Sequence, residues 1–518
     1  MFFQNKKLQL AGVLLLAAAL RFVFLADNPP GLFRDEADKG YTTYSLIKTG
    51  KDLGGHKWPL QIQSFGAYTS PFYHWLSIPS IRILGLNVFS TRLIAAIAGV
   101  LACGAVYLLG RAWASEKLGL LSALILAVSP WHLLFSRWAN QGILMTLFIP
   151  LALWATWRAL EISEDKRLKS LAWILLAGMF WGISWNTYAP ARLFVPLFMA
   201  SIFLIQIAFS PRRFSDGIRL VLAGLTSVAV ASPFILDILF HWEETQTRLK
   251  FLTGGEPLTW GGFLLNYLKH WDPGYLFLYG DENLRHHVPG EGQLNVFEVV
   301  FGLIGIFGLF KTTGLWRGWL LAWLLLSPVP AAITNEGLPH ALRTLMIVPG
   351  FSLLAGVGVA LAAHWLTQKS SVLSFAAIAI LIVAQTVFVG YLFFQKFPND
   401  EKAAYAWETG LVEALKWTEV SRGPTELCTL TGVLEYPEAY LQFVLKPDPG
   451  SIQRGGGYPG YHFLPLGRAT DPRRDTAEGL YLERAYFAGK PPNWKKVPPP
   501  EEYEKMDLYW RLYRVTTP

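Results

Sequence analysis

Five charged residues stand within six positions just after the first apolar segment of the chain: Arg34, Asp35, Glu36, Asp38 and Lys39. Charged groups at a bilayer edge are tolerated when they face water and costly when they face lipid. The cluster is therefore either an interfacial anchor or the rim of a polar cavity. A carboxylate in such a cavity can act as a general base if it reaches the proton of an acceptor group. For Asp38 and Lys39 the simpler interpretation is a solvated turn.

Cationic groups that suit an anionic ligand recur in other loops. Arginine binds phosphate oxygens through its forked guanidinium, and histidine beside a carboxylate supplies an acid or base partner. The residues that carry this pattern are Arg137 in Ser136 to Gln141, Arg192 after Tyr188, Asp281, Arg285 and His286 in one long loop, and His340 and Arg343 in a later one. Together they predict a site for a phosphate ligand.

The adjacent histidines His286 and His287 also invite a metal interpretation. No cysteine lies close to them, and they lack the helical His-x-x-x-His spacing of zinc enzymes. We therefore assign no metal ligand from the sequence and no certain cofactor, and a divalent metal stays open as an alternative.

Composition sets the class of protein. The 518 residues are 52% hydrophobic and 16% charged, with 21 Trp, 34 Phe and a net charge of +8; soluble domains carry about 25% charged residues. Lys and Arg gather in short loops between apolar runs, which indicates the positive-inside bias of a membrane protein rather than a nucleic-acid surface. Cys103 lies in an apolar run and Cys428 lies in a polar region far downstream, so the two do not indicate a disulfide framework.

About eleven apolar segments approach the roughly 20 residues needed to cross a bilayer. They run over 8–25, 91–109, 118–135, 142–160, 171–188, 193–209, 218–240, 296–310, 316–333, 345–363 and 372–394. The basic short loops then fall inside with the N-terminus. The Asp35 loop, the long loop of 241–295 and the C-terminal tail all fall on the outer, extracytoplasmic face.

Two domains follow from the change in hydropathy near Pro398. Residues 1–396 form a helical transmembrane domain with outer loops 27–87 and 241–295, and residues 397–518 form a small soluble α/β domain. In the latter, 408–418 predicts a helix, and 426–433 and 508–515 predict strands.

These residues describe a cavity at the outer membrane surface, with a carboxylate on one loop and cations on several others. It suits a substrate whose phosphate stays at headgroup level while its tail lies in lipid. The carboxylate would activate an acceptor hydroxyl or amine, and Arg and His would stabilise the leaving phosphate.

The chain resembles the membrane glycosyltransferases of the GT-C superfamily, in the group of protein O-mannosyltransferases and aminoarabinose transferases (glycosyltransferase family 39). The resemblance covers about 8–394 and lies in Asp35-Glu36-Ala37 after Pro-Pro-Gly, Ser129-Pro130-Trp131-His132 followed by Ser136-Arg137, Gly280-Asp281 with Asn283 to His287, and Pro339 to Arg343. It departs from the group at Asn140-Gln141, where many relatives carry an acid.

The resemblance implies an inverting transfer of a sugar from a polyprenyl-phosphate donor (dolichyl or undecaprenyl) to a protein, lipid or glycan acceptor. Asp35 would be the base, and Glu36 would support it or contact the acceptor. Arg137, Arg192, Arg285, His340 and Arg343 would bind the lipid phosphate and sugar; Asp281 or Glu282 would replace the missing acid. The expected place is the plasma membrane, with the site on the outer side, and nucleic acid is not an expected partner.

Two alternatives belong to other classes. A transporter or lipid flippase would distribute charge through the depth of its spans, whereas here charge collects at one edge. The second alternative is a membrane anchor that presents the C-terminal domain as a binding module. In that case the charged residues of the Asp35 and Arg343 loops would only flank membrane spans.

Overall fold

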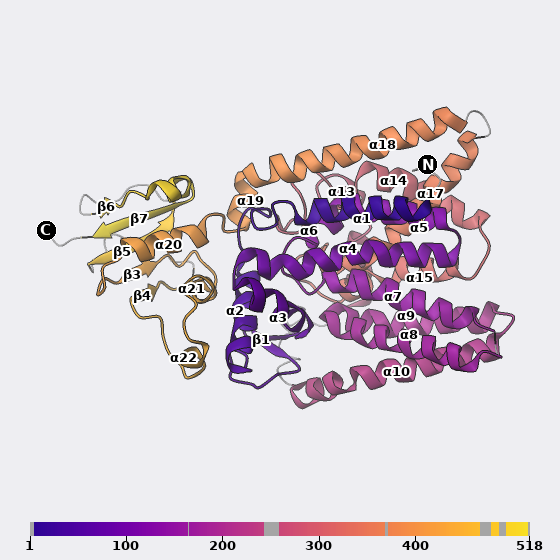
Figure 1. The fold of residues 1–518 in the computed structure, drawn as a ribbon, viewed down its shortest axis with the longest axis horizontal. Coiled ribbons are helices and arrows are strands. Elements are labelled where there is room, and N and C mark those ends of the chain that lie inside the picture. Colours follow the sequence, from indigo (N-terminus) through magenta and orange to yellow (C-terminus); the bar gives the residue numbers. More distant parts are fainter. Residues whose placement is uncertain are drawn as a thin grey trace.

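The computed structural model describes residues 5–163, 165–242, 258–367, 371–466, 478–485 and 494–515. Long helices lie side by side in one large bundle, and a smaller domain with a β-sheet lies beyond one end of that bundle (Figure 1). Residues 27–87 lie between the two parts and contact both (Figure 1).

The bundle is built from helices that coincide with the predicted apolar segments. They are α1 (Lys6–Phe22), α4 (Val88–Trp113), α5 (Glu116–Val128), α7 (Ile143–Glu161), α8 (Arg167–Thr187), α9 (Ala189–Phe209), α10 (Arg213–Phe240), α14 (Val296–Lys311), α15 (Trp316–Leu326), α17 (Val348–Thr367) and α18 (Ser371–Tyr391). Within the described ranges, seven helical segments are long and apolar enough to span a membrane. The chain is an integral membrane protein; the count of about eleven spans stays a prediction, because α1, α5, α14 and α15 fall outside those seven.

Glycines allow α14 and α17 to pack closely against each other. A Cβ atom on Gly305 would collide with the carbonyl oxygen of Leu354, and one on Gly358 would collide with that of Phe301. Small residues let helix backbones approach in a membrane, where packing rather than the hydrophobic effect drives association. These glycines therefore fix how near α14 and α17 lie.

The end of the bundle that faces the C-terminal domain carries short elements (Figure 1). The first loop forms α2 (Arg34–Thr49), the antiparallel hairpin β1 (Ile62–Ser64) and β2 (Ala67–Thr69), and α3 (Phe72–Leu84). Later loops add α6 (Pro130–Phe135), α12 (Trp260–Lys269), α13 (Pro273–Phe277), α16 (Val329–Ala332) and the 3₁₀ turn η2 (Leu345–Ile347). The prediction of a solvated turn at Asp38 and Lys39 is wrong: both lie within α2, and their exposed fractions are 5% and 6%.

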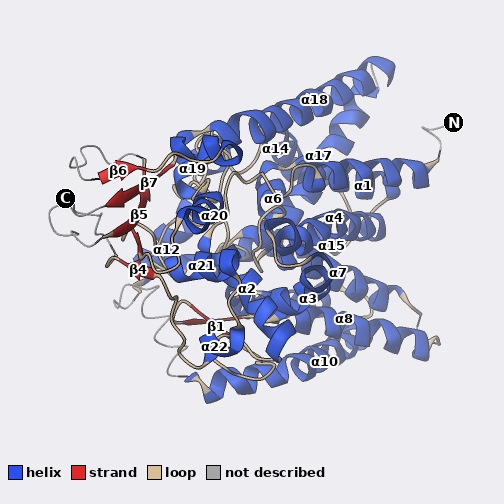
Figure 2. Cartoon of the chain, turned by 60° about the vertical axis from the view of Figure 1, so that its left-hand side comes forward, coloured by secondary structure: helices blue, strands red, loops and turns tan. Residues whose placement is uncertain are grey.

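The C-terminal domain has a mixed five-stranded sheet, seen at the left of Figure 2. Its elements are α19 (Glu401–Ala406), α20 (Leu411–Ser421), β3 (Cys428–Leu430), α21 (Pro437–Leu445), α22 (Pro449–Gln453), β4 (Tyr461–Phe463), β5 (Gly479–Arg484), β6 (Trp494–Lys496), η5 (Glu501–Leu508) and β7 (Trp510–Val515). The strand order is β4-β3-β5-β7-β6, with β3 parallel to β4 and β5, and β7 antiparallel to β5 and β6. The helix and both strands predicted from the sequence are present, with slightly different bounds.

This domain packs directly onto α2. One apolar cluster joins Ala37 and Tyr41 of α2 to the interior of the C-terminal domain. The Tyr41 hydroxyl donates to the Pro447 carbonyl at 2.9 Å, and the Gln453 amide donates to three oxygens of the first loop, each at 3.0 Å. The docked domain therefore holds the helix that carries Asp35.

Candidate active site

Asp35 stands in the first turn of α2, where backbone N–H groups and the helix dipole favour a negative charge. Its side chain is 39% exposed, and its nearest charged neighbour is the Arg34 guanidinium at 3.6 Å. The structure thus presents Asp35 as an accessible carboxylate, as a general base requires.

Glu36, the next residue, has a different environment. Glu36 is fully buried, and its carboxylate accepts hydrogen bonds from Arg92 Nε and Arg92 Nη2, each at 2.9 Å. Its two oxygens also accept the backbone N–H of Ala139 at 2.8 Å and of Phe33 at 3.3 Å. The geometry does not support the prediction that Glu36 contacts the acceptor, because this ion pair encloses the carboxylate.

Arg92 was missed by the sequence reasoning. It lies in α4, inside the predicted second span, and is fully buried. Besides Glu36 it donates to the carbonyls of Leu25, Ala26, Pro29 and Gly31. An arginine within an apolar segment was the available signal, since such a residue needs a partner inside the protein.

A cavity of about 160 Å³ lies beside the N-terminus of α2. It is lined by Phe33 and Arg34 of the first loop, Arg285 of the long outer loop, and Tyr405, Ala406, Glu408, Val433, Glu435 and Tyr440 of the C-terminal domain. Arg34 pairs with Glu435 and Glu408 pairs with Arg484. The walls therefore combine cations and acids from three separate parts of the chain.

Arg285 lines this cavity and interacts electrostatically with the nearby Asp35. The Arg285 guanidinium lies over the Phe33 ring, 4.0 Å from its centroid. Burial lowers the pKa of Arg285, and the Asp35 carboxylate opposes that change. Of the predicted cationic residues, Arg285 is thus the one that the structure places with Asp35.

Arg137 does not reach this cavity. It is fully buried and donates to the carbonyl oxygens of Leu20, Val23, Phe24 and Asn28 at 2.7 to 3.0 Å. Leu20 and Val23 lie at the C-terminal end of α1, where helix carbonyls lack a partner within the helix. The geometry does not support Arg137 as a phosphate ligand, because its guanidinium caps a helix.

Arg343 and Arg192 are also absent from the cavity wall. Arg343 is 7% exposed, and its guanidinium donates to Thr334 Oγ1, the Glu336 carbonyl and Glu336 Oε2 at 2.8 to 2.9 Å. Arg192 lies over the Trp185 ring, 5.7 Å from its centroid. The geometry does not support the expected composite of Asp35, Arg285 and Arg343, because Arg343 is held within its own loop.

Asp281, His286 and His340 form a separate cluster, in which Asp281 and His286 are buried and His340 is partly buried. Asp281 Oδ2 accepts from His286 Nδ1 at 2.9 Å and from the Ala341 backbone N–H at 2.8 Å, which joins the two outer loops. The His286 and His340 rings lie 4.8 Å apart. Burial, together with His286, holds the pKa of His340 well below its usual range. Burial raises the pKa of Asp281, but His286 and the backbone N–H groups outweigh it, so the net pKa is lowered.

A second pocket of about 290 Å³ lies on the other side of Arg34. Its lining includes Asp38, Gln63, Phe65, Tyr436, Glu438 and Gln442. The ring centroids of Phe65 and Tyr436 lie 4.3 Å apart with the rings tilted by 41°, and the Arg34 guanidinium lies 5.8 and 5.3 Å from these centroids. Burial raises the pKa of Asp38 to about 6, although the Ser64 hydroxyl donates to it at 2.7 Å. Carboxylates and amides therefore line this pocket.

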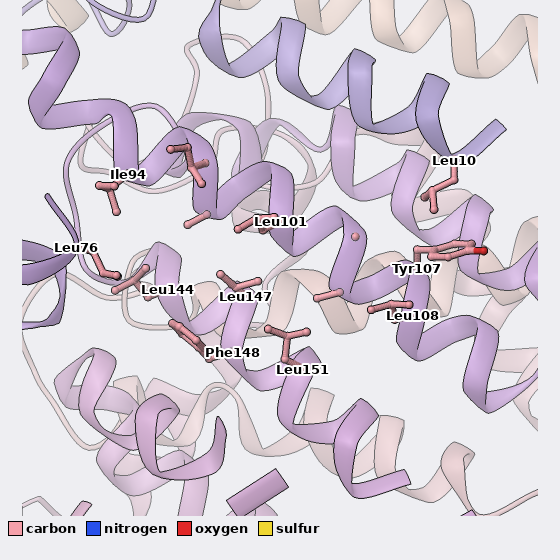
Figure 3. A pocket seen from close by; sticks show the side chains of 14 residues that line it. Leu10, Leu76, Ile94, Leu101, Tyr107, Leu108, Leu144, Leu147, Phe148 and Leu151 are labelled. Carbon is pink, nitrogen blue, oxygen red and sulfur yellow. The ribbon is translucent and has the colours of Figure 1, made fainter. Parts of the chain in front are cut away.

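An apolar groove of about 550 Å³ runs along α4 (Figure 3). Its lining comes from four helices: Leu10 of α1, Leu76 of α3, Ile94, Ile97, Ala98, Leu101, Gly104, Ala105, Tyr107 and Leu108 of α4, and Leu144, Leu147, Phe148 and Leu151 of α7. Ile94 stands two positions after Arg92, the partner of Glu36. This end of the groove therefore lies at the same level of the bundle as the Glu36–Arg92 pair.

The bundle, its outer loops and the docked sheet domain define a membrane protein of the GT-C fold. The structure superimposes on ArnT from Cupriavidus metallidurans bound to undecaprenyl phosphate with a TM-score of 0.57, at 12% identity, over 97% of each chain. The archaeal oligosaccharyltransferase AglB from Archaeoglobus fulgidus, in complex with an inhibitory peptide and a dolichol-phosphate, gives a TM-score of 0.55 at 13% identity, over 87% of this chain and 64% of that one.

Sequence comparison identifies proteins that are similar to this chain in sequence. A family model described as dolichyl-phosphate-mannose-protein mannosyltransferase matches residues 68–236. An undecaprenyl phosphate-alpha-4-amino-4-deoxy-L-arabinose arabinosyl transferase of Pseudomonas aeruginosa is 25% identical over 248 residues, which is 46% of this chain and 43% of that protein. The chain thus matches less than half the length of that curated relative. The matches support a GT-C protein of the family 39 type, as the sequence predicted.

Proposed function

We propose that this protein is a glycosyltransferase that moves a sugar from a polyprenyl-phosphate donor to an extracytoplasmic acceptor. The observation that carries the proposal is the accessible Asp35 carboxylate beside a cavity with Arg34 and Arg285 in its wall. The relatives that match in sequence are transferases of lipid-linked sugars by name, which supports the same class.

In the proposed reaction Asp35 accepts the proton of an acceptor hydroxyl or amine. The acceptor atom then attacks the anomeric carbon of the sugar, and the bond from that carbon to the phosphate oxygen breaks. The phosphate leaves with the electron pair, and the Arg285 and Arg34 guanidinium groups stabilise its charge. A single displacement of this kind inverts the anomeric carbon. Glu36 and Arg92 act as positioning residues that hold the α2 turn.

The donor lipid is proposed to lie in the groove along α4. The lining residues of the groove carry no charged group, and the Tyr107 hydroxyl is the polar side-chain atom among them. An isoprenoid tail would exchange contacts with lipid tails for van der Waals contacts with these side chains, because packing rather than the hydrophobic effect drives association within a bilayer. The outer end of the groove leads toward the charged turn, so the phosphate would reach the arginines.

The acceptor is proposed to enter through the Asp38 pocket. Carboxylate and amide oxygens accept hydrogen bonds from hydroxyl and amino groups, which suits a protein, lipid or glycan acceptor. Glu438 and Gln442 of the C-terminal domain complete this pocket. The proposed topology places both pockets on the outer face of the plasma membrane, with the N-terminus in the cytoplasm.

The test uses purified protein in lipid nanodiscs with polyprenyl-phosphate sugars, and follows consumption of each donor by mass spectrometry. Asp35→Asn should lower turnover by about 10²- to 10⁴-fold, the usual contribution of a general base, while donor binding persists. Asp27→Asn, which changes an exposed acid earlier in the same loop, is the matched control and should keep native turnover. Native turnover in Asp35→Asn would refute the assignment of the base. Failure to consume any lipid-linked sugar would refute the reaction.

A further inference from the structure

We propose that the end of the bundle opposite the C-terminal domain binds one anionic phospholipid. A cavity of about 510 Å³ lies there between the ends of three helices, α5, α14 and α17. It shares no lining residue with the groove along α4 or with the two pockets beside Arg34. The inference concerns lipid binding alone, so it does not rest on the proposed reaction.

The cavity lies far from the candidate active site. α4 begins directly after the first loop, and its 26 residues carry the chain about 39 Å along the bundle to Trp113. The next two residues, Ala114 and Ser115, line the cavity, and α14 and α17 contribute their last turns at Lys311 and His364. Figure 1 places α5 and α17 toward the end of the bundle away from the sheet domain. A ligand in this cavity is therefore distinct from the donor and the acceptor proposed above.

Polar side chains gather in the lining at the helix ends. Lys311 and His364 lie there together with Ser115 and Thr312. The Ser115 hydroxyl accepts the Leu118 N–H at 3.2 Å, so its own hydrogen can be donated to a ligand. A lysine ammonium offers three donors and a full positive charge. This rim therefore suits the oxygens of a phosphate group.

The charge around the rim favours an anion. None of the lining residues that the structure describes is acidic. Arg317 lies beside the rim, where its guanidinium donates to the Thr312 carbonyl at 2.9 Å. Glu116, the first residue of α5, is already paired with Arg111 at 3.4 Å and accepts from the Tyr107 hydroxyl. The rim therefore attracts a phosphate and repels an ammonium group, which selects an anionic lipid over one with an ethanolamine headgroup.

The deeper part of the lining suits an acyl chain. Val357 lies two turns, about 10 Å, before His364, and Phe307 lies one turn before Lys311. The Lys311 ammonium is 5.5 Å from the centroid of the Phe307 ring, so the cation lies directly beside the apolar part. Trp365, which is 45% exposed, packs against the same ring with centroids 5.8 Å apart, and tryptophan is typical of the headgroup level of a membrane. A free phosphate would contact the rim alone, whereas a phospholipid contacts both parts.

A lipid bound here would join three helices. A Cβ atom on Gly308 of α14 would lie 2.8 Å from Val357 Cγ1 of α17, so these two helices are already in close contact at the cavity. The third wall comes from Ser115 and Leu118 at the start of α5. Because the three walls come together only in the folded protein, the bound lipid should raise the melting temperature.

The first experiment counts bound lipid by native mass spectrometry of purified, full-length protein in detergent with added phosphatidylglycerol. One phosphatidylglycerol should remain on each chain. Lys311→Gln should weaken binding about fivefold, the usual effect of one basic residue at an anionic lipid surface. The matched control Lys169→Gln removes the same charge from an exposed position of α8 outside this lining, and should bind as the native protein does. Equal binding by all three proteins would overturn the proposal.

Two other probes distinguish a phospholipid from its separate parts. Phosphatidylethanolamine with the same acyl chains should bind more weakly than phosphatidylglycerol, and inorganic phosphate should not displace the bound lipid. Equal binding of phosphatidylethanolamine would indicate a purely apolar groove, and displacement by phosphate would indicate a simple anion site. Either result would refute the proposal.

A second measurement does not depend on the folding of any variant. Phosphatidylglycerol with a photoactivatable group in its acyl chain should label native protein within 307–316 and 357–365, as mapped by peptide mass spectrometry. Excess unlabelled phosphatidylglycerol should remove these labels, and the same excess should raise the melting temperature. Labels spread over all lipid-facing helices and unchanged by the competitor would contradict a specific site. These readouts are independent of sugar transfer, so they separate this inference from the proposed reaction.

Discussion

Replacing Glu36 should cost stability, whereas replacing its neighbour Asp35 should cost activity alone. Glu36 Oε1 accepts from Arg92 Nε and the Ala139 N–H, and Oε2 accepts from Arg92 Nη2 and the Phe33 N–H. In Glu36→Gln one oxygen becomes an NH₂ group. Either orientation of the amide then loses two accepted hydrogen bonds and sets donor against donor.

The expected size follows from those contacts. Two hydrogen bonds that involve charged groups contribute about 1.5 to 3 kcal/mol each, so their loss costs about 3 to 6 kcal/mol. Breaking a buried ion pair by removing one partner costs about 3 to 5 kcal/mol, which agrees. Asp35 has a half-exposed side chain at a helix N-terminus, and Asp35→Asn should cost less than about 1 kcal/mol.

The assay is thermal unfolding of each purified variant, followed by tryptophan fluorescence, beside turnover of the lipid-linked sugar. Glu36→Gln should melt several degrees below the native protein, and Arg92→Met lower still, because it also frees the carbonyls of Leu25, Ala26 and Pro29. Asp35→Asn should melt near the native temperature. An inactive Glu36→Gln with native stability would refute the reasoning and return Glu36 to the chemistry.

Three further predictions test other parts of the structure. The folded protein holds the Asp38 proton more tightly than the unfolded chain, since burial raises its pKa from 3.8 to about 6; stability should therefore fall as the pH rises through this window. Asp38→Asn should remove that loss, a gain of up to about 3 kcal/mol near pH 7 and none near pH 3, measured as unfolding midpoints at both pH values. Burial raises the pKa of Glu408 to about 7, although Arg484, Arg285 and Arg34 oppose it, so deprotonation above pH 7 adds negative charge to the cavity. The KM for the anionic donor should rise across that pH range and should stay level in Glu408→Gln; equal profiles would contradict this. Gly358→Ala should destabilise the protein by at least about 1 to 3 kcal/mol, because its Cβ meets the Phe301 carbonyl, whereas Gly302→Ala on α14 meets nothing within 4 Å and should be tolerated in the same melting assay.

The helices were predictable because their signal is local. An apolar run of about 20 residues is recognisable without its neighbours, so each predicted segment falls on helical structure, although 118–135 is divided into α5 and α6 and 316–333 into α15 and α16. The same holds for β7, whose alternation through Tyr509, Arg511 and Tyr513 indicated a strand. The sequence also predicted that the charged loops lie close together in space. The structure confirms this for two of them, which are joined by the hydrogen bond from the Ala341 N–H to Asp281.

The roles of single arginines were not predictable. Whether an arginine at a helix boundary binds a ligand or caps a helix depends on which carbonyls lie within its reach, and that is a property of tertiary packing. Arg137 reaches the end of α1, and Arg343 reaches Glu336, although both looked like Arg285 in sequence. Arg92 was missed because it lies inside an apolar run, and because its partner, Glu36, precedes it by 56 positions in the sequence.

The docked C-terminal domain changes how the alternative of a separate binding module must be tested. Its residues Glu408 and Tyr440 line the cavity beside Asp35, and Glu438 and Gln442 line the second pocket. Its removal would also expose the apolar face of α2 at Tyr41. Deletion of 397–518 would therefore abolish function whether the domain binds a partner or completes an active site. A substitution that leaves the domain in place, such as Asp35→Asn, separates the two, because a binding module would keep its function without that carboxylate.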